Sequence, residues 1–386
     1  MRRILLFGVI VLVLAGMVAC SAASTGTGPS TPSTATKDAY ISGVVATTNS
    51  GALQPVYWKD GVLNFLPLNS GYIGGNAGQI AVDSSNNVYI AGNQFGGPSA
   101  NLVGYWRNGT FVTVSSGNPN VYIWNIVIDS SGNIWLGGNT SGTSFQWAEI
   151  LSANAATGTV SSNGTLAGSP NNVYGLTADM AGNVYYVGSE PSGSNYLPEY
   201  WKNGGGATEL AFSGGNTFAY VQQTAVDSSG NVYIVGNQWG GTTGGPVYYK
   251  NEGTPTTLPL GTYNGNGYWS VSGIAVNSAG NLSFVVEYGP GSAATTLLYW
   301  ASPTSTPTVM SLPSGTTKIG QGFGSAAFDA NGNFVVAGQA GNTYQSGTSG
   351  NTTDGVPVYW LNGNSAKLPM GSGNAWGAAQ FVAFVP

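Results

Sequence analysis

The chain of 386 residues contains no histidine and only one cysteine, Cys20. Without histidine it has neither the base of a Ser-His-Asp or Cys-His catalytic apparatus nor an imidazole ligand for a metal ion. A single cysteine cannot form an internal disulfide. Charged residues make up 6% of the chain and acids outnumber bases by 14 to 9, so the basic patches that nucleic-acid binding requires are not expected.

Long hydrophobic runs are also missing, apart from one near the N-terminus. Arg2 and Arg3 precede an apolar run at 4–18, which is shorter than the ~20 residues of a membrane-spanning helix and is typical of a secretory signal peptide. Residues 17–20, Met-Val-Ala-Cys, resemble the lipobox of bacterial lipoproteins, which implies cleavage before Cys20 and lipid on its sulfur and amine. The alternative is an ordinary signal peptide with an incidental cysteine.

These features predict three segments. Residues 1–19 are a lipoprotein signal peptide, residues 20–37 are a lipidated cysteine followed by a flexible Ser/Thr/Pro/Gly tether, and residues 38–386 are a folded domain. Removal of Arg2 and Arg3 leaves 9 − 2 = 7 bases against 14 acids, a net charge of −7. We therefore expect an extracytoplasmic protein that a lipid holds at the bacterial cell envelope, on the outer membrane or the cell surface.

Three short patterns recur in a fixed order in the folded domain. Examples are the apolar run QTAVD at 223–227, the run NVYIVG at 231–236 and the aromatic run EYWKNG at 199–204. Runs of Val, Ile, Tyr, Trp and Phe between Gly, Asn and Asp turns are typical of β-strands, and no segment keeps a helical period. Four strands in a repeat of about 50 residues predict an all-β propeller.

The number of repeats predicts a seven-bladed β-propeller of four-stranded blades. The aromatic pattern occurs seven times if FQW at 145–147 is counted as a degenerate copy; six or eight blades remain open if it is misread. The chain begins inside a repeat, with DAYISG at 38–43, and the missing first strand appears at the other end as AAQFVAF at 378–384. We expect this C-terminal strand to complete the N-terminal blade and close the ring, which removes an open sheet edge.

The repeats resemble the bacterial NHL-like and SBBP-type propeller repeats, in which an apolar strand, Asp-x-x-Gly-Asn and Val-Tyr-Val/Ile follow one another. The resemblance covers residues 38–386 and implies that the QTAVD-type strand lies innermost, beside a central channel. The YWKNG element is not part of the common NHL pattern. Propellers host unrelated activities, and those of the streptogramin-lyase type use histidine, so no activity is carried over to this chain.

The recurring aspartate, as in DSSGN at 227–231, invites a calcium-binding or catalytic interpretation. Each copy supplies one carboxylate, whereas a calcium site needs several converging oxygens. Asp at the start of a turn instead accepts backbone N–H groups, and Gly adopts the positive φ of the turn. We therefore predict turns, no metal site and no cofactor. The Tyr-Trp pairs, which could stack on a sugar, are predicted to pack between blades.

Long connections on the face opposite these turns are the expected place for a ligand, because binding usually resides in variable loops on a rigid scaffold. Neutral aromatic and amide side chains gather there and suit a glycan or a peptide. Glu287 is added because it is predicted to occupy the place of a glycine in the other repeats. The candidate ligand-binding residues are Trp239, Trp124, Trp269, Trp376, Tyr174, Tyr344, Phe95, Gln79, Asn125, Gln223 and Glu287, with Gln380 if the last repeat is aligned correctly. The alternative is that they only pack the loops.

The sequence thus predicts a monomeric binding or scaffold module without enzyme activity. Its expected partners are the membrane, through the lipid anchor, and a neutral glycan or a protein, but no nucleic acid. The alternative is a polysaccharide-active enzyme that uses carboxylates such as Glu190 or Glu287 on the long-loop face, in which two acids would lie ~5–10 Å apart in a cleft.

Overall fold

The computed structural model describes residues 38–48, 51–97, 101–114, 121–140, 145–150, 154–166, 172–192, 195–241, 244–263, 267–289, 296–320, 325–343 and 352–385. The expected signal peptide, Cys20, the tether and Tyr344 lie outside these ranges. Contacts between residues join 32–386 into one unit. None of the described residues forms an α-helix, so none of them provides a helix able to cross a membrane.

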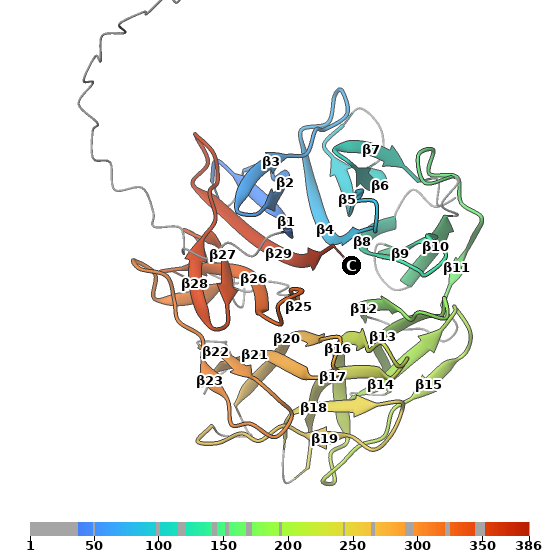
Figure 1. The fold of residues 1–386 in the computed structure, drawn as a ribbon, viewed down its shortest axis with the longest axis vertical. Coiled ribbons are helices and arrows are strands. Elements are labelled where there is room, and N and C mark those ends of the chain that lie inside the picture. Colours follow the sequence, from blue (N-terminus) through green and yellow to red (C-terminus); the bar gives the residue numbers. More distant parts are fainter. Residues whose placement is uncertain are drawn as a thin grey trace, which may run out of the picture. The chain divides into compact units, whose positions relative to one another are not determined.

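The strands of this unit form small antiparallel sheets arranged around a centre (Figure 1). Three sheets come from the N-terminal half. The first contains β1 (Ala39–Ala46), β2 (Gln54–Lys59) and β3 (Val62–Phe65), the second β4 (Gly74–Val82), β5 (Val88–Phe95), β6 (Leu102–Arg107) and β7 (Thr110–Thr113), and the third β8 (Val121–Ile128), β9 (Ile134–Thr140), β10 (Phe145–Ile150) and β11 (Ser162–Thr165).

Three further sheets follow the same order. They are β12 (Asn172–Ala178), β13 (Val184–Ser192), β14 (Asn195–Lys202) and β15 (Ala207–Glu209); β16 (Phe218–Val226), β17 (Val232–Trp239), β18 (Gly245–Lys250) and β19 (Thr256–Thr257); and β20 (Tyr268–Val276), β21 (Leu282–Gly289), β22 (Thr296–Trp300) and β23 (Thr308–Val309). The last sheet contains β24 (Lys318–Gly320), β25 (Ala326–Phe328), β26 (Phe334–Gly341), β27 (Val356–Leu361) and β28 (Asn364–Lys367).

The C-terminal strand β29 (Trp376–Phe384) pairs with β1, so the first sheet has the order β29-β1-β2-β3. This pairing of the two ends of the described chain confirms the expected closure. The innermost strands contact one another in a closed cycle: β29 with β4, β4 with β8, β8 with β12, β12 with β16, β16 with β20, β20 with β25 and β25 with β29. The chain is therefore an all-β propeller.

The prediction of seven four-stranded blades is wrong, because only six of the sheets have this form. The remaining sheet is five-stranded, and both β24 and β25 pair with β26. The inner position of this sheet is held by β24 and β25, and residues 321–324 between them lie outside the described ranges. At the end of β24 the Gln339 side chain fills the space beside Gly320, 2.1 Å from where a Cβ would lie, so this place requires glycine.

The core lies between the sheets, where the described third strands other than β10 each carry a large buried aromatic side chain. Trp58, Trp106, Trp300 and Trp360 are 1% exposed or less. Their indole N–H groups donate across sheets, for example from Trp106 to the Pro67 carbonyl at 2.9 Å and from Trp300 to the Pro259 carbonyl at 2.8 Å. The packing interpretation of these aromatic residues is confirmed. Loss of one such ring typically costs about 3–5 kcal/mol.

The recurring aspartates form turns, as predicted. The Asp227 Oδ1 accepts the backbone N–H groups of Ser229 and Asn231, both at 2.9 Å, and Gly230 adopts a φ of 80°. Asn277, which replaces aspartate in one copy, accepts the equivalent two N–H groups. Burial opposes ionisation of Asp227, but hydrogen bonds from Asn231, Tyr233 and Ser229 hold the pKa of its carboxyl group below the usual value.

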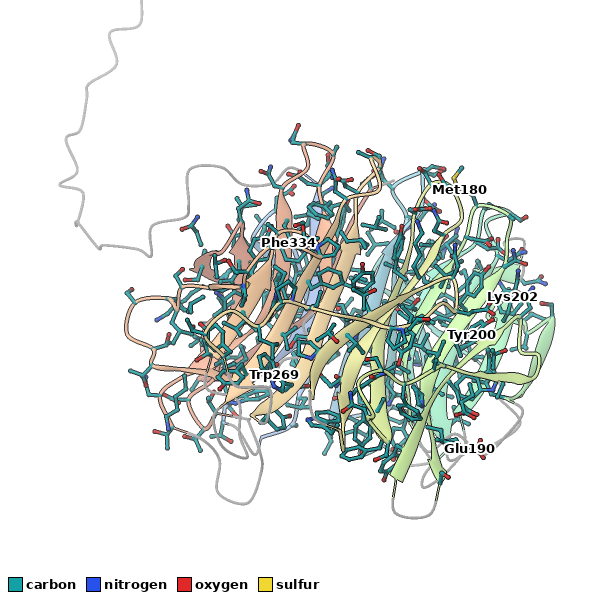
Figure 2. All side chains as sticks on the ribbon, turned by 90° about the horizontal axis from the view of Figure 1, so that it is seen from below. Met180, Glu190, Tyr200, Lys202, Trp269 and Phe334 are labelled. Atoms are coloured by element: carbon teal, nitrogen blue, oxygen red, sulfur yellow. The ribbon has the colours of Figure 1, made fainter. Side chains whose placement is uncertain are left out.

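The turns and the other strand connections lie at opposite ends of the sheets. Figure 2 shows Met180, in the turn between β12 and β13, and Glu190, near the far end of β13, on opposite sides of the unit. The far end therefore carries the last residue of each second strand, such as Trp239 of β17.

Candidate functional site

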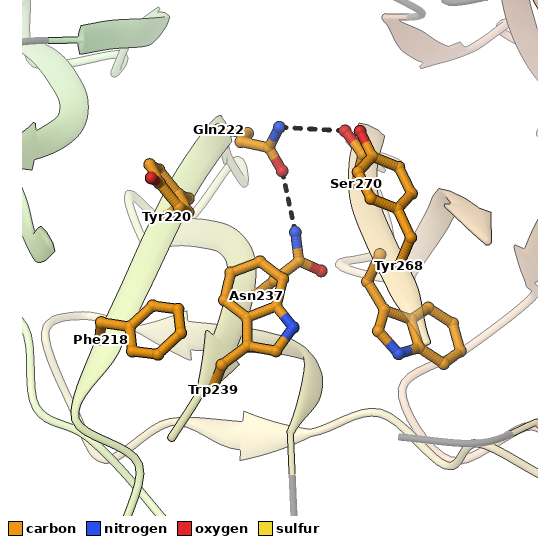
Figure 3. Close-up of a pocket in the computed structure, with 8 residues that line it drawn as sticks. Phe218, Tyr220, Gln222, Asn237, Trp239, Tyr268 and Ser270 are labelled. Carbon is orange, nitrogen blue, oxygen red and sulfur yellow. Dashed lines mark hydrogen bonds between the residues drawn. The ribbon is translucent and has the colours of Figure 1, made fainter. Parts of the chain in front are cut away.

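An aromatic cleft opens between the β16–β19 sheet and β20. We use the name aromatic cleft for the cavity of about 370 Å³ lined by Phe218, Tyr220, Gln222, Asn237, Trp239, Tyr268, Trp269 and Ser270 (Figure 3). Alternate residues of a strand point to one face, so Phe218, Tyr220 and Gln222 of β16 share a side. None of these described lining residues carries a charge.

Trp239 is the centre of an aromatic row in this cleft. Its ring stacks on Phe218 at a centroid distance of 5.6 Å and meets Tyr220 edge-on at 5.9 Å. Tyr220 in turn lies 4.7 Å from Tyr196 of β14, in the preceding sheet. Trp239 is only half-buried, so these contacts hold the indole in place while part of it faces solvent. Trp269 is 2% exposed and packs on Tyr288, which makes it part of the wall.

Two amides join the aromatic cleft to the next sheet. Asn237 Nδ2 donates to Gln222 Oε1 at 3.0 Å, and the same oxygen accepts the backbone N–H of Val271 in β20 at 2.9 Å. Gln222 Nε2 donates to Ser270 Oγ at 3.2 Å. Figure 3 shows the hydrogen bonds of Gln222 with Asn237 and with Ser270 above the Trp239 ring.

Asn237 differs from its counterpart in the β4–β7 sheet. Asn93, at the same position of β5, satisfies both ends of its amide on Ile123 in the next sheet: Nδ2 donates to the carbonyl and Oδ1 accepts the N–H, both at 2.9 Å. Gln222 takes the corresponding N–H of Val271 instead. As a result, the Oδ1 atom of Asn237 accepts no hydrogen bond from any described residue, although the side chain is only 1% exposed. A buried acceptor without a donor typically lowers the free energy of unfolding by about 1–3 kcal/mol.

A second cavity, of about 440 Å³, lies beside the innermost strands. We call it the central cavity. β-bulges in β8, β12, β16 and β20 each leave one residue outside the regular pairing, which turns its side chain away from the sheet. The residues at these four bulges, Trp124, Tyr174, Gln222 and Ser272, all line the central cavity.

The structure brings most of the predicted site residues into these two cavities. Trp239 and Trp269 line the aromatic cleft, and six further predicted residues line the central cavity. The residues of the second group are Trp124, Asn125, Tyr174, Gln223, Glu287 and Gln380.

Three predicted residues have structural partners away from the described cavities. Gln79 Oε1 accepts the N–H of Ile126 in the neighbouring strand β8, at 3.1 Å. Trp376 is 9% exposed and donates from Nε1 to the Thr352 carbonyl at 2.7 Å. Phe95 occupies in β5 the place of Trp239 in β17, but it faces Gly74 where Trp239 faces Phe218. Phe95 therefore lacks the stacked ring that builds the aromatic cleft.

The sequence alignment of Glu287 is wrong by one residue. The register pairs Val286 with Val271 and Glu287 with Ser270, so Val286, and not Glu287, corresponds to Gly236. Glu287 instead takes the position of Asn237. It is 4% exposed, and Ser272 Oγ donates to its Oε1 at 3.0 Å. A carboxylate thus lies at the wall of the central cavity.

The other acids do not join Glu287. Glu190 lies on β13, next to Glu199 of β14, and neither of these residues lines the two cavities described above. Burial, followed by repulsion from Glu190, raises the pKa of Glu199 to about 7. Asp354 accepts the N–H groups of Asn342 and Thr343 and so closes a loop.

Sequence reasoning missed Tyr220, Gln222, Asn237 and Tyr268 in the aromatic cleft. Gln222 gave one signal, because it stands immediately before the recurring apolar run, where other repeats have Trp124, Tyr174 and Ser272. A position that varies in chemistry between otherwise regular repeats is a candidate for function. The bulge that exposes it could not be read from the sequence.

Comparisons with known proteins support the repeat architecture. A family model described as two component regulator propeller matches residues 117–140, which include β8 and β9. No curated protein matches the chain. Among solved structures, a puromycin-hydrolysing peptidase of Mycobacterium tuberculosis is 11% identical with a TM-score of 0.54, over 88% of this chain and 52% of that chain. A puromycin hydrolase structure is 11% identical with a TM-score of 0.51, over 87% and 52%. This chain spans about half the length of these proteins, and the likeness concerns the fold alone.

Proposed function

We propose that this propeller is a binding module that holds a neutral saccharide in the aromatic cleft. The buried Asn237 Oδ1, which has no donor among the described residues, is the observation that carries the proposal. A sugar hydroxyl group is a neutral donor that can reach such an acceptor and also accept a hydrogen bond in return. A bound hydroxyl would remove the cost of the unsatisfied acceptor.

The aromatic rings support the same ligand class. Trp239 and Tyr268 line the aromatic cleft together with the Asn237 amide (Figure 3). Aromatic faces bury the apolar C–H surface of a sugar ring while leaving its hydroxyl groups free for amides. Because the described lining of the aromatic cleft carries no charge, it does not favour an anionic or cationic ligand. It also offers no carboxylate for acid–base catalysis, so binding without chemical conversion fits these residues best.

We propose further that the protein works outside the cytoplasm on a lipid anchor and that its repeats are of the NHL-like and SBBP type. The signal-like residues 1–19 and the lipobox-like residues 17–20 support the anchor, and the DSSGN turns support the repeat type. Expression with labelled palmitate tests the anchor. Label that persists in Cys20→Ala would contradict it, whereas loss of both label and membrane association is expected.

A glycan array probed with the full chain tests the saccharide site. We expect binding to neutral oligosaccharides, and a loss of affinity of roughly 10-fold or more in Trp239→Ala, since aromatic stacking contributes about 1–3 kcal/mol. Phe95→Ala is the matched control, because it removes a ring from the same strand position outside the aromatic cleft. Capture of a protein partner with equal affinity by both variants, and of no glycan, would argue for a scaffold instead.

A further inference from the structure

The central cavity differs from the aromatic cleft in the charge of its lining. Glu287 is the one charged residue among the described residues that line it. The Glu287 side chain is 4% exposed. A cationic group that enters this cavity can therefore pair with the Glu287 carboxylate where water screens the pair poorly.

One amide acceptor of the central cavity requires a donor. Gln380 Oε1 is buried and accepts no hydrogen bond from any described residue. Gln380 belongs to β29 and Glu287 to β21, so the two acceptors come from different sheets and face one cavity. A ligand group with several N–H donors and a positive charge satisfies both requirements.

Aromatic side chains complete the lining. Trp124, Tyr174, Tyr268 and Phe381 border the same cavity. Aromatic faces attract organic cations through the ring quadrupole, and this attraction grows when the cation leaves water. Tyr174 is 37% exposed, which shows that solvent reaches the wall of the central cavity.

We infer that the central cavity is a second binding site, for an organic ammonium group held between Glu287 and these aromatic rings. The site is separate from the saccharide site and goes beyond it. The two cavities share Gln222, Tyr268 and Ser270, and the hydrogen bond from Gln222 to Ser270 lies in the shared wall. An amino sugar and an ethanolamine-type headgroup carry the same primary ammonium chemistry and are the two sources to distinguish.

Calorimetric titration of the full chain tests the inference with two matched pairs of probes. Glucosamine is compared with N-acetylglucosamine, and ethanolamine with its uncharged analogue 1-propanol. We expect at least one cation to bind roughly 10-fold or more tightly than its uncharged partner, as a charge-assisted hydrogen bond in a buried site allows. The pair that shows the preference identifies the source. Equal binding within both pairs would overturn the inference.

Two variants locate the effect. Glu287→Gln keeps the shape of the side chain and is expected to abolish the preference for the cation, whereas Trp239→Ala keeps it. If Glu287→Gln does not fold, Gln380→Glu decides, because a second carboxylate in the cavity should increase affinity for the cation several-fold. A preference that survives Glu287→Gln, or no increase in Gln380→Glu, would overturn the assignment. Failure of the saccharide site appears separately, as a lack of neutral glycan binding.

Discussion

Replacement of Glu199 by valine is expected to stabilise the propeller at neutral and alkaline pH. Glu199 occupies the strand position that Val56, Val247 and Val358 occupy in other sheets, since each pairs with the equivalent residue of the second strand. Its side chain is 6% exposed, and its Oε2 has no hydrogen-bond partner among the described residues. The position is built for an aliphatic side chain, and a carboxylate there is poorly solvated.

The size of the effect follows from the pKa of Glu199. Burial and the nearby Glu190 raise this pKa from 4.5 to about 7, so the folded chain binds the proton more tightly than the unfolded chain. The resulting stabilisation is fully present below pH 4.5 and is lost as the pH rises to about 7. A difference of about 2.5 pH units corresponds to roughly 3 kcal/mol in the free energy of unfolding.

Urea unfolding at pH 5 and pH 8 measures this contribution. Between the two pH values the wild type should lose roughly 2.5 kcal/mol more than Glu199→Val, because only the wild type must ionise the buried group, and at pH 5 a small part of the full effect is already lost. Val247→Glu, which places a carboxylate at the same position of the next sheet, should acquire a pH dependence of the same sign. The reasoning would be refuted if the wild type and Glu199→Val changed equally between pH 5 and pH 8.

Two substitutions and one deletion test the repeat architecture. Asp227→Ala should lower the free energy of unfolding by about 1–3 kcal/mol, because the turn loses its acceptor. Calcium should leave the stability of the wild type unchanged. Denaturation of both proteins with and without calcium checks the two predictions. Gly236→Ala should destabilise the fold by about 2 kcal/mol or more, because the new Cβ would lie 2.0 Å from the Tyr220 carbonyl oxygen. Gly206 has open space around it, so Gly206→Ala should leave the stability unchanged. Thermal unfolding measures both variants. Deletion of 376–384 should open the sheet that contains β1, and limited proteolysis should then cut β1–β3 first.

Local features of the fold could be predicted from the sequence because they depend on residues close together in the chain. The turn at Asp227 needs only the spacing Asp-x-x-Gly-Asn, and its hydrogen bonds join residues two and four positions apart. The buried Trp106 was predictable because a large aromatic residue, Trp or Tyr, recurs at this place in the repeats. Ring closure by β29 was predictable because a first strand was missing at one end and present at the other.

Features of the site depend on contacts between sheets, which the repeat pattern does not contain. The open acceptor of Asn237 arises because Gln222 occupies the backbone N–H of Val271 in the next sheet. The position of Glu287 was misread because Val286 replaces the glycine that marks this place in other repeats. Glu199 was overlooked because its neighbour Glu190 approaches only through the pairing of β13 with β14.

The pairing of β29 with β1 also determines when the chain can finish folding. Residues 39–46 are synthesised first, but their partner at 376–384 leaves the ribosome roughly 20 to 70 s later at ordinary translation rates. During this interval the nascent chain is an open arc whose first strand offers an unpaired edge. The last strand of a neighbouring nascent chain can occupy that edge as well as its own. A high local concentration of unfinished chains therefore favours exchange of this strand between chains over closure of the ring within one chain.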